Sequence, residues 1–188
     1  MPFPYPPEIK NSRVMVFVDG ENLAMRYANL LGDKQPFKHV QFERDTYVWS
    51  PLLDGNSHRT VNTVRRYYYT SVRGDEDHRN KIHDKLYALG IQAPRVFPKN
   101  KSRGSKRVDI SLSVEMLSHA HYGNYDVAVL VAGDQDYVPL VEAVKAQGPQ
   151  VFVWFVRDGL NPALRRSADY FFDLGEILLS EKAPLYMV

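Results

Sequence analysis

The sequence contains no cysteine among its 188 residues. This absence excludes disulfide bonds, thiolate zinc sites and a cysteine nucleophile, and it fits a protein of the reducing cytoplasm. No apolar run reaches the roughly 20 residues that a transmembrane helix requires, so no membrane contact is expected. The first seven residues include four prolines and lack the basic and apolar segments of a signal peptide. They predict an extended, proline-rich arm over residues 1–12.

A large net charge is also absent, since the chain carries only +2 at pH 7. Any affinity for polyanions must therefore come from local clusters of basic residues. Hydrophobic residues make up 44% of the chain and charged residues 24%, which is ordinary for a globular protein. The length suits one domain with a sizeable core, over residues 13–188.

Two apolar runs end in acidic residues followed by helix starts. Residues 14–18 are all apolar and lead into Asp19 and Gly20, and a helix is expected over residues 21–31. Residues 126–131 are expected to form the second strand, whose apolar run after Asp126 leads through Gly133 to Asp134 and Asp136. Asp19 and Asp136 could each simply cap a helix, whereas no such structural role is expected for Asp134.

Strands and helices alternate along the rest of the chain. Further strands are expected over residues 62–69, 92–97, 150–156 and 169–173, and further helices over 77–89, 108–120, 137–147, 161–168 and 174–179. Residues 108–120 also alternate as a strand would, but the length without a breaker favours a helix with Asp109 in its first turn, where the dipole favours a carboxylate. Residues 33–60 have no clear pattern, which indicates either a functional excursion or short elements.

This alternation predicts an α/β fold, a three-layer α/β/α sandwich with a mostly parallel central sheet in strand order 3-2-1-4-5. In that order the strand that ends at Asp19 neighbours the strand that leads to Asp134, at the usual ligand crevice. If Asp19, Asp109, Asp134 and Asp136 converge there, their mutual repulsion of about 4 kcal/mol per close pair favours a hard divalent cation. Such an ion suits metal-assisted hydrolysis of a phosphodiester.

A basic segment adjoins Asp109. Most runs of charge are only solvated loops, but basic residues beside a carboxylate cluster suit contact with nucleic-acid phosphates. The candidate nucleic-acid-binding residues are Lys99, Lys101, Arg103, Lys106 and Arg107.

Three segments together resemble a known family. The stretches VFVDGENL (16–23), KRVDI (106–110) and VLVAGDQDYVPL (129–140) resemble the NYN domain family, and more narrowly its LabA-like (DUF88) branch of the PIN-like nucleases. The resemblance implies a metal-dependent ribonuclease that uses Mg²⁺ or Mn²⁺. It assigns the acidic site to Asp19, Asp109, Asp134 and Asp136, with Asn22 orienting a carboxylate or a water molecule. Arg107 and Gln135 depart from the family pattern, which has glycine or a small residue there.

The expected partner is RNA, single-stranded more than double-stranded, although the sequence does not distinguish RNA from DNA. One rival function is a non-catalytic RNA-binding or regulatory module on the same fold. Another is an aspartyl-phosphate phosphatase built on Asp19, for which no lysine motif is visible. A dinucleotide-binding enzyme is disfavoured because no G-x-G-x-x-G follows the first strand. The apolar tail over residues 178–188 suits packing on its own domain or on a second copy in a homo-oligomer.

Several conspicuous residues receive a structural interpretation. The histidines His78, His83, His119 and His121 are expected at the surface or in ordinary helix contacts, and the run of tyrosines at 67–69 is expected in the core. Glu115 is expected on a different helix face from Asp109, and Glu21 is expected to favour its helix N-terminus.

Overall fold

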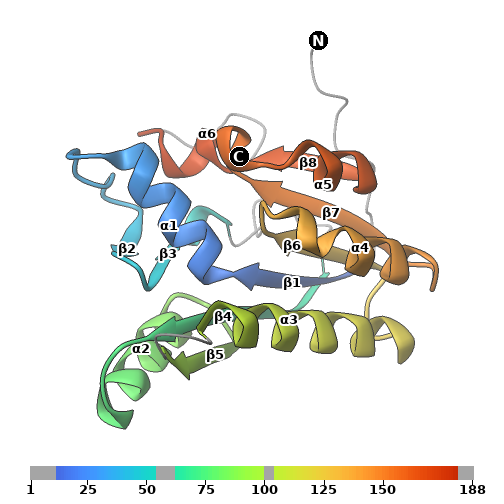
Figure 1. Cartoon of the computed structure of the whole chain (residues 1–188), viewed down its shortest axis with the longest axis horizontal. Helices are drawn as coiled ribbons and strands as arrows, with labels where there is room; N and C mark the ends of the chain where they lie inside the picture. The colour runs from blue at the N-terminus through green and yellow to red at the C-terminus, as the bar shows by residue number, and fades with distance from the viewer. Residues whose placement is uncertain (1–11, 54–61, 100–103, 182–188) are drawn as a thin grey trace.

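The computed structural model describes residues 12–53, 62–99 and 104–181 (Figure 1). The predicted arm over residues 1–12 lies outside the described residues except for Ser12, and so do the last seven residues of the tail. Among the described residues, no helix is long and apolar enough to span a membrane.

Six parallel strands form one central sheet in the order β5-β4-β1-β6-β7-β8. This is the predicted order 3-2-1-4-5, extended by a sixth strand at the edge. The strands are β1 (Arg13–Asp19), β4 (Asn62–Val72), β5 (Ala93–Pro98), β6 (Val127–Val131), β7 (Gln150–Phe155) and β8 (Tyr170–Asp173). The fold class is therefore confirmed, and the carboxyl ends of the strands all lie at one edge, on the left in Figure 1.

Helices cover both faces of the sheet. Because parallel crossovers are right-handed, the reversal of strand order after β5 places α1 and α2 on one face and α3, α4 and α5 on the other. The helices are α1 (Gly20–Leu31), α2 (Glu76–Ala88), α3 (Gly104–His121), α4 (Val138–Lys145), α5 (Pro162–Ser167) and α6 (Gly175–Leu178). The described residues also form three short 3-10 helices, η1 (Pro51–Leu53), η2 (Gln135–Tyr137) and η3 (Arg157–Gly159).

Helix α3 begins earlier than the sequence predicted. It starts at Gly104 instead of residue 108, so Lys106 and Arg107 are helical and not part of a loop. After Gly104 no residue breaks the helical pattern, and the Arg107 guanidinium lies 4.9 Å from the centre of the Phe97 ring, which ties the helix start to β5. The prediction that Asp109 belongs to the first turn is therefore wrong, and the helix dipole does not explain this carboxylate.

The region that the sequence left unassigned contains a small hairpin. Strands β2 (Gln41–Glu43) and β3 (Tyr47–Trp49) pair antiparallel, outside the main sheet. The Tyr68 hydroxyl donates to the carbonyl of Val48 at 3.1 Å and accepts from its N–H at 3.0 Å. Since Trp49 is fully buried, the hairpin is an integral part of the core.

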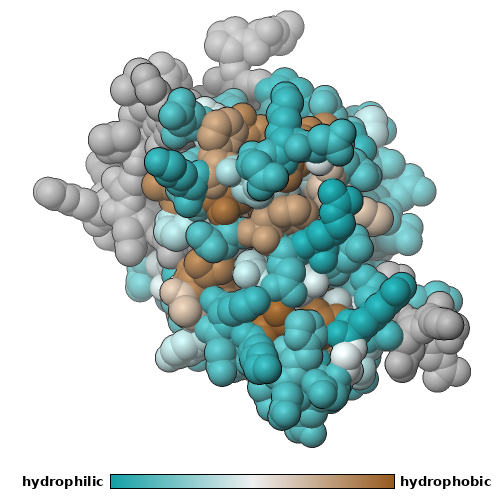
Figure 2. Space-filling view, turned by 90° about the vertical axis from the view of Figure 1, so that its left-hand side faces the viewer, coloured by the Kyte–Doolittle hydropathy of each residue, from teal (hydrophilic) through white to brown (hydrophobic). Residues whose placement is uncertain are grey.

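The strands that lead to the acidic residues lie at the centre of the sheet core. All residues of β1 after Arg13 are buried, as are all residues of β6. In the sheet register Asp19 pairs with Tyr69 of β4, and Val18 pairs with Val131 of β6. Asp19 therefore stands just beyond the last pairing with β6, at the point where the strand order reverses. Figure 2 looks onto this edge, where hydrophilic residues cover most of the surface and hydrophobic ones show as separate patches.

Candidate active site at the strand ends

Two aspartates from distant segments meet on one tyrosine hydroxyl. The Tyr137 hydroxyl, from η2, lies 2.9 Å from Oδ2 of Asp19 at the end of β1. The same oxygen lies 3.2 Å from Oδ1 of Asp109, on α3. Asp19 is only 4% exposed, and Tyr137 is 3% exposed. The predicted convergence of Asp19 and Asp109 is thus present, and it is organised by a residue that the sequence analysis did not select.

The surroundings of Asp19 disfavour its negative charge. Burial raises the pKa of Asp19 to about 7, while hydrogen bonds from Asn22 and Tyr137 work in the opposite direction. Repulsion from Asp109 and Glu21 raises this pKa further. The Tyr137 hydroxyl has a single proton and can donate it to only one of the two carboxylates. The other carboxylate needs a proton of its own or a nearby cation. Burial also raises the pKa of Asp109, and repulsion from the charges of Glu21, Asp134 and Asp136 raises it further.

Asp134 and Asp136 lie at the exposed rim of this cluster. Both side chains are exposed, and both act electrostatically on Asp109. Asp134 caps η2, since its Oδ1 accepts from the N–H of Asp136 at 3.2 Å. The expectation that Asp134 has no structural role is therefore wrong, because the helical turn begins before Asp136. Capping leaves the second carboxylate oxygen of Asp134 available to solvent or ligand.

Asn22 joins the two strand-end turns. Its backbone N–H donates to Oδ1 of Asp19 at 3.0 Å, so Asp19 also caps α1. Its side-chain oxygen accepts from the N–H of Gly133 at 3.0 Å. Asn22 thereby fixes the loop after β6 against the start of α1, which is how it contributes to the position of the carboxylates.

Glycines allow these turns to come close together. A Cβ on Gly20 would collide with the Tyr68 ring. A Cβ on Gly133 would collide with the Phe155 ring and would lie 2.7 Å from the carbonyl oxygen of Gly159. Each glycine therefore stands where a side chain would push two elements of the site apart.

A polar groove of about 320 Å³ opens beside Asp134. It lies between the turns that follow β1, β6 and β7. Its lining residues are Asn22, Gly133, Asp134, Gln135, Asp158, Gly159, Leu160 and Asn161. Gln135, one of the departures from the family pattern, therefore forms part of a wall that a bound molecule would touch.

Glu21 connects the acidic cluster to the basic segment. Its Oε1 accepts a hydrogen bond from Ser71 and lies 3.7 Å from Nζ of Lys99. Glu21 also stands in the first turn of α1, as predicted. Lys99 is therefore close to the site, and Lys106 and Arg107 are exposed on the first turns of α3. The candidates Lys101 and Arg103 lie outside the described residues.

Glu115 belongs to a separate network. It accepts from Tyr69 at 2.5 Å and from Nη2 of Arg95 at 2.9 Å. One helical turn away, His119 contacts the Tyr67 hydroxyl at 2.8 Å. Burial lowers the pKa of His119, which favours its neutral form. These contacts support the structural interpretation of Glu115, His119 and the buried tyrosines.

The NYN domain family matches residues 13–178, almost the whole described chain. The chain belongs to the NYN domain family. This NYN domain is 25% identical over 177 residues to the low amplitude and bright protein LabA of Synechococcus elongatus, covering 88% of this chain and 86% of that protein. Both findings confirm the predicted family and its LabA-like branch.

A solved structure has the same fold. It is the crystal structure of a protein of unknown function from Vibrio parahaemolyticus, with a TM-score of 0.67 and 17% sequence identity. The alignment covers 90% of this NYN domain and 96% of that chain. NYN domains generally have the PIN-like nuclease fold, and the parallel sheet described above agrees with it.

Proposed function

We propose that this NYN domain is a metal-dependent ribonuclease that hydrolyses RNA phosphodiester bonds with Mg²⁺ or Mn²⁺. The observation that carries the proposal is the meeting of Asp19 and Asp109 on the Tyr137 hydroxyl at the strand ends. Asp134 and Asp136 are exposed and repel the charge of Asp109. A buried carboxylate whose pKa is raised by burial and by a neighbouring carboxylate is typical of functional sites.

The donor set fits a hard divalent cation. All the candidate ligands are carboxylates, and Asp19 is buried where only a proton or a cation can offset its charge. Within the part of the chain that the structure describes, no group of three or more acidic, histidine or cysteine side chains is arranged to hold a metal ion. The proposal therefore requires that one or two carboxylates hold Mg²⁺ and that waters and substrate phosphates complete its coordination.

In this proposal Asp19 and Asp109 would hold the metal, and Asp134 and Asp136 would contribute negative charge from the rim. When bound, the metal would stabilise the charge on the phosphodiester and lower the pKa of a water molecule. Tyr137 positions the two inner carboxylates through its hydroxyl. Asn22 positions the Asp134 loop through Gly133. Because Asp19 is buried, its interactions with the Tyr137 hydroxyl and with a bound cation are stronger than they would be in water.

The second candidate is a non-catalytic RNA-binding module. The favouring observation is that Asp19 and Asp109 already share a hydrogen-bonding partner, so the site is coherent without a metal. In that case the same surface would bind RNA without cutting it. The two functions differ in whether a divalent cation changes the RNA or only its affinity.

The test combines cleavage with an independent measurement of metal binding. End-labelled single-stranded RNA and DNA are incubated with wild type, Asp134→Asn and the control Asp84→Asn, in Mg²⁺, Mn²⁺ or chelator. Asn at position 134 can still cap η2, and Asp84 is an exposed residue of α2. We expect metal-dependent cleavage of RNA by wild type and Asp84→Asn only.

Thermal unfolding with and without Mn²⁺ provides the second readout. A ligand that binds only the folded state raises the melting temperature. We expect Mn²⁺ to stabilise wild type and to stabilise Asp109→Asn much less. Cleavage that survives in Asp134→Asn would contradict the site. Salt-sensitive RNA binding without cleavage or Mn²⁺ stabilisation would favour the binding module.

A further inference from the structure

A second pocket, of about 270 Å³, lies at the same edge of the sheet. The turn between β2 and β3 forms one wall, and the ends of β4 and β5 with the first turn of α2 form the other. The lining residues are Arg44, Asp45, Thr46, Val72, Arg73, His78 and Lys99. The hairpin that no sequence pattern had revealed therefore builds a pocket, which gives the excursion over residues 33–60 a candidate function.

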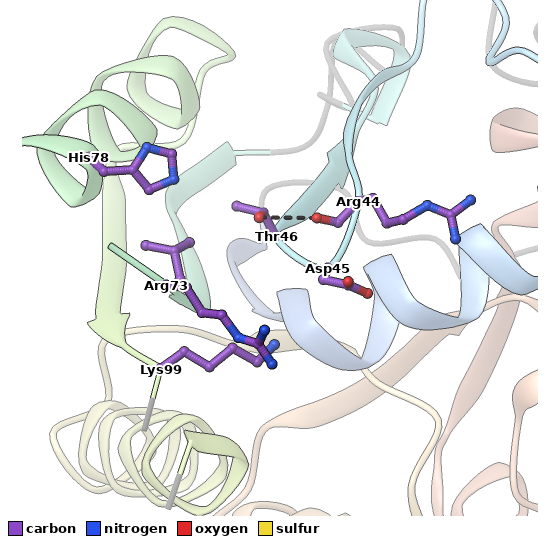
Figure 3. A pocket seen from close by; sticks show the side chains of 7 residues that line it. Arg44, Asp45, Thr46, Arg73, His78 and Lys99 are labelled. Atoms are coloured by element: carbon purple, nitrogen blue, oxygen red, sulfur yellow. Dashed lines mark hydrogen bonds between the residues drawn. The ribbon is translucent and has the colours of Figure 1, made fainter. Parts of the chain in front are cut away.

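Positive charge gathers inside this pocket. Figure 3 shows the side chains of Arg73 and Lys99 ending close together in the same space, while Arg44 extends in another direction. Arg73 is exposed and has no hydrogen-bonding or ion-pair partner within the described residues. Two adjacent cations repel each other, so an anion between them would be favourable. Among the described lining residues, Asp45 on the opposite wall is the one acidic residue.

The pocket is adjacent to the acidic site. Lys99 lines the pocket and also lies 3.7 Å from Glu21, which acts electrostatically on Asp109. Val72 follows three positions after Tyr69 on β4, and Tyr69 pairs with Asp19 in the register. At 3.3 Å per strand residue, Val72 lies about 10 Å along β4 from Tyr69, the partner of Asp19 in the sheet. A few nucleotides of RNA could span this distance.

We propose that the pocket formed by Arg73, Lys99 and the β2–β3 turn binds a backbone phosphate of the RNA next to the cleaved bond. This inference rests on the proposed function and names how that site holds its substrate. The lining is polar apart from Val72, and the two cations Arg73 and Lys99 end close together in it, so it suits a phosphate. An extended polyanion can occupy this pocket and the acidic crevice at once, which a free phosphate ion cannot do.

The test measures RNA affinity in chelator, where cleavage does not interfere. A fluorescein-labelled single-stranded RNA oligonucleotide is titrated with wild type, Arg73→Gln and Arg166→Gln over a range of salt concentrations. Arg166 is also an exposed arginine, and it lies on α5, which leads into β8 at the opposite end of the sheet from β5. Loss of one phosphate contact reduces the slope of log K against log salt by about 0.7, which is about five-fold in affinity at 0.1 M salt. We expect this change for Arg73→Gln and none for Arg166→Gln.

A variant with the opposite sign completes the design. Asp45 has a φ of +59°, and asparagine tolerates this left-handed conformation, so Asp45→Asn should fold normally. It removes the negative charge from the pocket wall and should tighten RNA binding. Opposite shifts from Arg73→Gln and Asp45→Asn support the proposal, because general damage to the protein would weaken binding in both.

The outcomes separate this proposal from the nuclease proposal. Metal-dependent cleavage by wild type, with Arg73→Gln binding RNA as tightly as Arg166→Gln, overturns the pocket and leaves the nuclease standing. No cleavage, with weakened binding by Arg73→Gln, supports the pocket as an RNA phosphate site and overturns both the nuclease and the placement of that phosphate beside a cleaved bond. Inorganic phosphate that raises the melting temperature of wild type but not Arg73→Gln, with equal RNA affinities, would make the pocket a small-anion site and overturn the proposal. Absence of RNA binding by wild type overturns it as well.

Discussion

The buried carboxylate of Asp19 makes the stability of this NYN domain depend on pH. Its pKa is about 7 in the folded protein, chiefly because burial disfavours the charge, against about 3.9 for an exposed aspartate. Asp19→Asn keeps a side-chain oxygen that can cap α1 but cannot ionise. The substitution therefore removes the titration while it preserves the local structure.

The sign and size of the effect follow from linkage. Between about pH 4 and pH 7 the unfolded chain loses the Asp19 proton while the folded chain retains it, so wild-type stability falls as pH rises. Three pH units correspond to an upper limit of about 4 kcal/mol. We expect Asp19→Asn to match wild type near pH 4 and to be more stable by about 2–4 kcal/mol at pH 8, without divalent cations.

Urea unfolding of both proteins in chelator, from pH 4 to pH 8, measures this difference. Other titrating groups act on both proteins, so the difference between the two curves reports Asp19. Asp84→Asn serves as the control, because its exposed side chain should leave the curve parallel to that of wild type. Parallel curves for Asp19→Asn and wild type would refute the idea that burial of this carboxylate destabilises the folded state.

Two further substitutions test the contacts around the site. Tyr137→Phe removes the hydroxyl that lowers the pKa of Asp19, so the stability should continue to fall up to a higher pH than in wild type. About 1–3 kcal/mol of unfolding free energy should be lost at pH 8. Unfolding curves identical to those of wild type at every pH would refute the shared hydrogen bonds. Gly133→Ala places a methyl group against the Phe155 ring and the carbonyl of Gly159, so the unfolding free energy should fall by about 1–3 kcal/mol at all pH values. An unchanged melting temperature would show that the loops can move apart without cost and would contradict this prediction.

The local pattern of the sequence was sufficient for the fold class. Apolar runs such as residues 14–18 predict buried strands because a strand in a parallel sheet is covered on both faces. Alternation with helices then restricts the topology, and the predicted strand order is present. The position of Asp19 at a strand end was predictable for the same reason, since the carboxyl ends of parallel strands share one edge.

Other features depend on contacts between residues far apart in the chain, which periodicity does not encode. Tyr137 follows Asp134 closely in sequence, but only the register of β1 and β6 and the placement of α3 bring its hydroxyl to Asp19 and Asp109. The β2–β3 hairpin lacks a strong alternating pattern, and its contacts come from residues distant in sequence such as Tyr68, Tyr27 and Lys85. The sequence by itself determined the fold and the chemical type of the site, whereas tertiary packing decided which side chains touch and which carboxylate is buried.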